Sequence, residues 1–191
     1  MYRNSKSYDE LDRLAIEIYC DYRFNSFPLD VREVCHKLGV MLVPYSAFGQ
    51  WERELLKKQS LYGFLMPQSS ESPATIFYND DRAELRSEGC IRQTIFHEIK
   101  HYVCGDENDE DDDLAEHFGK YFPAPIPYLI VKNISSPNEI VSRFGVSMTV
   151  ACNIASQVRN RRAKYGDRIF EYEKPLIHLL DPLYYGLYLS D

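Results

Sequence analysis

The sequence has no long uncharged apolar run, and this absence argues against helices that span a membrane. The longest candidate, Tyr121–Val131, is short and is interrupted by three prolines. The first ten residues are polar, a pattern that predicts no signal peptide. We therefore expect no membrane association.

Paired cysteines are also lacking. The chain has five cysteines, an odd number, and none of them forms a C-x-x-C motif. Structural disulfides are typical of secreted proteins, and C-x-x-C pairs are typical of structural zinc and redox sites. The sequence therefore predicts reduced thiols and a cytoplasmic protein.

Positive charge is scarce as well. The chain has 22 Lys and Arg against 29 Asp and Glu, which gives a net charge of -7. This balance argues against a general binder of nucleic acid or of membrane surfaces. Apolar material is abundant, since 45% of the residues are hydrophobic and 14% are aromatic. We expect these 191 residues to bury a full core in one domain, or in one domain with a small appendage.

One short motif carries chemistry. Residues 97–101 form the pattern H-E-x-x-H within a segment, about Leu85–Cys104, that should be helical. Four residues advance an α-helix by about 400°, so His97 and His101 project from nearly the same face. Two imidazoles so placed can hold one Zn²⁺. Glu98 lies beside them, where it can act as general base on zinc-bound water.

The surroundings of the motif favour a metal helix. Apolar residues recur at helical spacing on the opposite face, and Gly105 is a natural C-terminal stop. These apolar residues are Ile91, Ile95, Ile99 and Tyr102. The alternative, a surface helix with two unrelated histidines, leaves Glu98 and the spacing to coincidence.

The segments before this helix predict two further helices and a small sheet. An amphipathic helix is expected to begin near Asp9, and a second helix covers Val31–Leu38. Strands are expected at Val40–Val43, Tyr62–Met66 and Thr75–Tyr78. An edge strand can bind an extended peptide by β-addition, and the third of these strands is the candidate edge.

A catalytic zinc site needs three protein ligands and one open position, so a third ligand must come from elsewhere. An acidic segment, Asp106–Asp113, follows the metal helix, and another helix is predicted over Leu114–Phe122. A carboxylate in the first turn of this helix can reach the metal. Composition alone leaves five candidates open. They are Asp109, Asp111, Asp112, Asp113 and Glu116.

The chain resembles the ImmA/IrrE family of zinc metallopeptidases from Tyr8 to about Pro127. The resembling segments are Phe27-Pro28-Leu29-Asp30-Val31, Lys37-Leu38-Gly39-Val40, Ile76-Phe77-Tyr78-Asn79, Gln93-Thr94-Ile95-Phe96-His97-Glu98 and Ala115-Glu116-His117-Phe118-Gly119-Lys120-Tyr121-Phe122-Pro123-Ala124-Pro125. The resemblance implies an α+β fold. Its zincin-like peptidase core would occupy residues 1–130 and combine a small antiparallel or mixed sheet with the H-E-x-x-H helix.

By this resemblance the third zinc ligand is Asp112, three residues before Ala115. The chain departs from the family here, since Asp replaces Glu and its carboxylate reaches less far. Glu116 stands where the family has Asn or Asp, and it is expected to orient a ligand histidine or to be the alternative ligand. Lys100 replaces a Gly common before the second histidine, and we expect it on the solvent side of the helix.

Residues 131–191 are predicted to form a helical, helix-turn-helix-like segment and a C-terminal tail. A helix start is expected at Ser136, a turn at Gly145 and a cap for the next helix at Ser147. The end of that next helix, Gln157–Lys164, is basic. DNA contact fits this pattern, and so does a packed helical pair whose arginines lie in water.

Two functions from different classes follow. The first is a zinc-dependent endopeptidase with Glu98 as general base. The resembled family is associated with cleaving helix-turn-helix transcriptional repressors and with phage or mobile elements, which implies a regulatory protease with a protein substrate. The second is a non-catalytic regulatory or DNA-binding protein with a degenerate zinc site. A complete metal site with an open position favours the enzyme.

Overall fold

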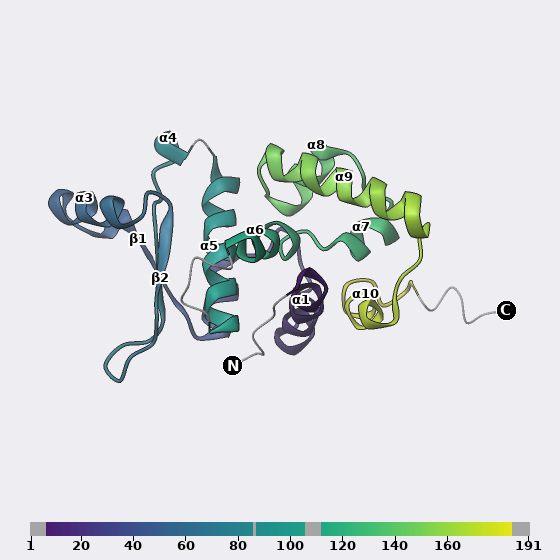
Figure 1. The fold of residues 1–191 in the computed structure, drawn as a ribbon, viewed down its shortest axis with the longest axis horizontal. Helices are drawn as coiled ribbons and strands as arrows, with labels where there is room; N and C mark the ends of the chain where they lie inside the picture. The colour runs from purple at the N-terminus through teal and green to yellow at the C-terminus, as the bar shows by residue number, and fades with distance from the viewer. Residues whose placement is uncertain (1–6, 86, 106–111, 185–191) are drawn as a thin grey trace. The chain divides into compact units, whose positions relative to one another are not determined.

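The computed structural model describes residues 7–85, 87–105 and 112–184. The protein is α+β, mostly helical with a three-stranded mixed sheet (Figure 1). It divides into two compact units, the first holding residues 30–119 and the second holding residues 7–29 and 120–184 of the described chain. The boundary expected at residue 130 divides the chain by function, into a peptidase core and a C-terminal segment, and not by compactness. It stays a prediction.

The sheet belongs to the first unit. Its strands are β1 (Met41–Pro44), β2 (Gly63–Met66) and β3 (Thr75–Tyr78). Their order is β1-β3-β2, with β1 parallel and β2 antiparallel to β3. The predicted strand positions are thus confirmed, but the prediction that residues 75–78 form an edge is wrong, because β3 is central. Thr75, Ile76 and Tyr78 are all buried, as expected for a strand covered on both faces.

Helix α5 (Glu88–Cys104) packs beside β2 and β3 and carries the H-E-x-x-H motif (Figure 1). The Ser87 hydroxyl accepts a hydrogen bond from the Cys90 N–H and caps its start. Gly105 ends it in the left-handed conformation, with φ of 66°, as predicted. The residues before Ser87 form a separate short helix, α4 (Arg82–Leu85).

Lys100 corrects an expectation about α5. Its side chain was expected in solvent, yet Lys100 is 0% exposed. The neighbouring positions on this flank of the helix, Phe96 and Cys104, are buried too, as are Ile91, Ile95 and Ile99 on the other side. Residues on most sides of α5 are therefore buried, and Lys100 is one of them.

The first unit contains further helices beside the sheet and α5. α2 (Val31–Leu38) begins at an Asp30 cap, ends at Gly39 as predicted and packs on α5. The hydroxyl of Tyr102 donates to the Leu38 carbonyl at 3.0 Å. The 3-10 turn η1 covers Tyr45–Ala47 and α3 covers Gln50–Gln59. α3 was not predicted; it buries no residue, and its apolar side chains Trp51 and Leu55, four positions apart, are exposed.

Helix α6 (Asp112–Tyr121) starts in the first unit and ends in the second. The second unit also contains α1 (Tyr8–Tyr22), whose cap is Ser7 rather than the expected Asp9. Its other elements are α7 (Ile126–Val131), α8 (Pro137–Phe144), α9 (Met148–Tyr165), η3 (Glu171–Glu173) and α10 (Lys174–Leu180). An aromatic cluster fills this unit, and within it the Tyr19 hydroxyl donates to the Phe122 carbonyl at 2.7 Å.

The helical pair α8–α9 forms where it was predicted. Gly145 ends α8 with φ of 66°, and the Ser147 hydroxyl caps α9 by accepting from the Val150 N–H. Its likeness to a DNA-binding helix-turn-helix stays a prediction. Within the part of the chain that is described, no helix is long and apolar enough to cross a membrane. All five cysteines are free thiols.

Two cations at the basic end of α9 are held inside the second unit. The guanidinium of Arg161 forms a two-pronged ion pair with Glu173, one contact measuring 2.6 Å, and the Glu173 side chain is 0% exposed. Arg162 pairs with Asp167 and also donates to the Ile130 carbonyl. These contacts favour a packing role for part of the basic run.

We expect Arg161→Met to destabilise the protein by about 3–5 kcal/mol, because it leaves the Glu173 carboxylate buried without its cation. Urea unfolding at neutral pH measures the change. Arg159→Met, on the exposed side of the same helix, is the matched control and should shift stability by less than about 0.5 kcal/mol. The double variant Arg161→Met with Glu173→Leu should recover most of the loss. Equal behaviour of the two single variants would contradict a structural role for the pair.

Candidate metal centre

The two histidines of the motif lie together on α5, one turn apart. Their Nε2 atoms are 3.3 Å apart and their ring centroids are 5.1 Å apart. Both side chains are partly buried. The helix therefore presents two imidazole nitrogens to one point, as the four-residue spacing predicted.

A carboxylate from α6 completes the group. Asp112, the first residue of α6, places Oδ1 3.1 Å from His97 Nε2. One ligand atom from each of His97, His101 and Asp112 lies within 4.8 Å of the others, and among the described residues this is the one such group that can hold a metal ion. Asp113 and Glu116 are described but do not belong to it, and Asp109 and Asp111 lie outside the described residues.

The spacing of these atoms fits a small divalent cation. Tetrahedral zinc with ligands at 2.0–2.2 Å places neighbouring ligand atoms about 3.4 Å apart. The observed separations of 3.3 Å for His97–His101 and 3.1 Å for His97–Asp112 are close to this value. Asp112 is 65% exposed, so the group opens to solvent on its carboxylate side. Three protein ligands with one open side is the arrangement of catalytic rather than structural zinc.

Burial keeps His97 in the form that binds metal. The pKa of His97 is lowered, chiefly by burial and then by the neighbouring His101, while Asp112 and Glu116 oppose this shift. A lowered pKa leaves the imidazole neutral at neutral pH. Since a proton and a metal ion compete for Nε2, the ring is ready to act as a ligand.

Glu98 lies beside the metal group but outside it. Its side chain is buried, and it lines the same pocket as His97 and Asp112. The pKa of Tyr45 is raised to about 12 by burial and, next in size, by the negative charge of Glu98, so this tyrosine lies near the carboxylate. Its hydroxyl remains protonated and donates to the Ser60 carbonyl at 2.9 Å. Glu98 therefore lines the pocket beside the three possible ligands and is not one of them.

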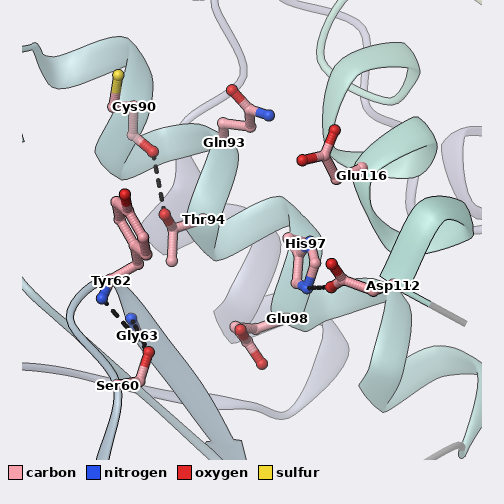
Figure 2. Close-up of a pocket in the computed structure, with 10 residues that line it drawn as sticks. All are labelled: Ser60, Tyr62, Gly63, Cys90, Gln93, Thr94, His97, Glu98, Asp112 and Glu116. Carbon is pink, nitrogen blue, oxygen red and sulfur yellow. Dashed lines mark hydrogen bonds and ion pairs between the residues drawn. The ribbon is translucent and has the colours of Figure 1, made fainter. Parts of the chain in front are cut away.

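These side chains line a pocket of about 500 Å³, within the range of ligand sites. α5 supplies its floor, the segment leading into β2 forms one wall, and α6 forms the other (Figure 2). The floor carries Cys90, Gln93, Thr94, His97 and Glu98; the walls carry Ser60, Tyr62 and Gly63 on one side and Asp112 and Glu116 on the other. Sequence patterns identified the motif and the carboxylates but gave no signal for the β2 wall.

Two glycines allow both walls of the pocket to come close to α5. A Cβ on Gly63 would lie 2.8 Å from the Phe77 carbonyl oxygen and 2.9 Å from Thr94 Cγ2. A Cβ on Gly119 would lie 3.1 Å from the Gln93 carbonyl oxygen and 3.4 Å from the His97 nitrogen. Gly63 therefore has no room for a side chain, and a side chain at Gly119 would require its neighbours to shift by a few tenths of an ångström. The two glycines thus help to set how near β2 and α6 approach α5.

Comparisons with models of protein families, with curated proteins and with solved structures find no match for this chain. The resemblance drawn from the motifs therefore stays a prediction, and the site depends on its own geometry.

We expect Asp112→Ala to weaken zinc binding at least about 100-fold, because loss of groups that merely support a ligand already costs 10–100-fold. Calorimetric titration with Zn²⁺ against a competing chelator measures the affinity. Glu116→Ala, on the same face of α6, is the matched control and should change the affinity only a few-fold. The opposite ranking would make Glu116 the third ligand.

Gly119→Ala should lower zinc affinity about tenfold, because the added methyl pushes α6, and Asp112 with it, away from α5. Alanine in a helix is otherwise more stable than glycine by about 0.5–1 kcal/mol, so the melting temperature should not fall in parallel. Gly49→Ala serves as control, since a Cβ there meets only the flexible end of Glu52. Equal zinc affinity in the two variants would show that the close approach at Gly119 does not position the ligand.

Proposed function

We propose that the protein is a zinc-dependent endopeptidase that cleaves a peptide bond in a protein substrate. The observation that carries the proposal is the convergence of His97, His101 and Asp112 on one point, with Glu98 beside it in an open pocket. A structural metal site would need a closed set of four ligands and no neighbouring base.

When bound, zinc would supply a Lewis acid that lowers the pKa of water toward about 7 and polarises the peptide carbonyl. His97, His101 and Asp112 would hold it. Glu98 accepts the proton of the attacking water and passes it to the amine nitrogen that leaves. The hydrogen bond from Tyr45 to Ser60 leaves the Tyr45 proton in place, so this neighbour does not compete with Glu98 as a base.

β2, at an edge of the sheet, lies beside this site and could bind an extended substrate. The Tyr62 carbonyl accepts from the Asn79 N–H at 2.8 Å, so alternation along the antiparallel pair turns the backbone of Leu65 to the outer edge of β2. A peptide that adds to this edge would run along the wall of the pocket, next to the metal group. β2 thus takes the role first expected for residues 75–78.

The resemblance to the ImmA/IrrE family supports a regulatory role, with a helix-turn-helix transcriptional repressor as substrate. The same resemblance supports zinc as the metal. So do the mixed nitrogen and oxygen ligands and the distances of His97 Nε2 from the other two ligand atoms, which are close to those around tetrahedral zinc. The cytoplasm, where such a repressor works, suits a protein with free thiols.

A second candidate, a non-catalytic regulatory or DNA-binding protein, is favoured by the turn between α8 and α9. The first turns of α9 expose Thr149, Cys152 and Asn153, where a recognition helix would contact bases. The ion pairs of Arg161 and Arg162 within the unit reduce the positive charge left for phosphates. We therefore place this function second.

Glu98→Gln should retain zinc but lower cleavage by about 10²–10⁴-fold, because the base is removed while the three ligands stay. The assay uses helix-turn-helix transcriptional repressors, with the candidates taken from the genes that flank this one. Cleavage is followed by mass spectrometry and zinc content by elemental analysis. Glu54→Gln, on the exposed α3, is the matched control. Normal cleavage by the Glu98 variant would exclude Glu98 as the base and refute the mechanism.

A further inference from the structure

The pocket beside the metal group is acidic. The charged side chains that line it are Glu98, Asp112 and Glu116, and no lysine or arginine of the described residues is among its lining. With a divalent ion present, the charges of Asp112 and Glu98 balance that of the metal. Glu116 then adds a further carboxylate to the lining of the pocket.

Glu116 lies on the α6 wall, away from the point where the ligand atoms converge. Its side chain is exposed, and Figure 2 shows its carboxylate pointing from α6 toward the side of the pocket that holds Gln93. It also influences His97 electrostatically, which places its charge near the reacting centre. A substrate side chain that enters this part of the pocket meets a carboxylate.

Tyr62 forms the opposite wall and is 57% exposed. Its backbone is fixed on both sides, since its N–H donates to the Ser60 hydroxyl at 3.3 Å and its carbonyl accepts from Asn79. Figure 2 shows the ring rising from the start of β2 toward Cys90 and Thr94. An exposed aromatic ring on a fixed backbone is a ready surface for stacking, with little ordering needed on binding.

We propose that this part of the pocket binds an arginine side chain of the substrate, close to the bond that is cut. The guanidinium stacks on the Tyr62 ring and donates to the Glu116 carboxylate, two contacts that suit its flat, forked shape. A lysine ammonium, a compact point charge, makes the second contact without the stacking and is held less well. This inference deepens the proposed peptidase function and depends on it for the identity of the ligand.

The test compares two peptides of equal length and shape, acetyl-Ala-Ala-Arg-Ala-Ala-amide and the same peptide with neutral citrulline in place of arginine. Binding is followed by NMR titration of zinc-loaded protein that carries Glu98→Gln, so that neither peptide is cut. We expect the arginine peptide to bind about tenfold more tightly. Adding Glu116→Gln should abolish the preference, Tyr62→Leu should reduce it, and Glu54→Gln should leave it unchanged. The spectra also show whether each variant is folded.

Equal affinity for the two peptides would overturn the inference, and so would a preference that survives Glu116→Gln. Failure of the two proposals can be told apart. If arginine is preferred through Glu116 but zinc-loaded protein with Glu98 intact cuts no substrate, the pocket is assigned correctly and the peptidase function fails. If the repressor is cut but arginine and citrulline bind alike, the peptidase function stands and the arginine site fails.

Discussion

The close approach of β2 and α6 to α5 is the constraint on which the candidate site depends. Two glycines permit it, since any side chain at Gly63 or Gly119 would meet backbone or helix atoms at 2.8–3.4 Å. The α5 helix supplies two imidazoles and a base, but a helix surface alone is convex. The pocket exists because a strand on one flank and a helix on the other are drawn in close enough to form walls.

Charge in this unit is arranged around the expected cation. Three carboxylates line one pocket, which without a cation is unfavourable because like charges repel. Burial lowers the pKa of His97 and favours its neutral form, so this ring does not provide the missing positive charge at neutral pH. Lys100, although buried on the same helix, is not part of the pocket lining. A divalent ion, which His97, His101 and Asp112 could hold, would supply the positive charge that the side chains lining the pocket do not provide.

Features set by local sequence were predictable, and features set by distant contacts were not. The motif helix, its Gly105 stop, the strands and the turn at Gly145 follow from spacing, caps and glycine conformation. Which strand lies at the edge depends on pairing between segments far apart in sequence, so β3 was misplaced. The burial of Lys100 and the tight contact at Gly119 depend on what covers α5, and neither leaves a local pattern.

The shorter carboxylate at position 112 can be understood from the geometry of α6. Asp112, Glu116 and Gly119 are four and three residues apart, so they share one face of the helix, and that face meets α5. A glutamate would allow the helix axis to lie farther from the histidines, whereas an aspartate requires a nearer backbone. Gly119 provides that nearness two turns along the same face, where its missing side chain brings α6 against the backbone of Gln93 and His97. The position of Asp112 beside the histidines therefore depends on the close contact at Gly119, and a longer carboxylate at position 112 would not need that contact.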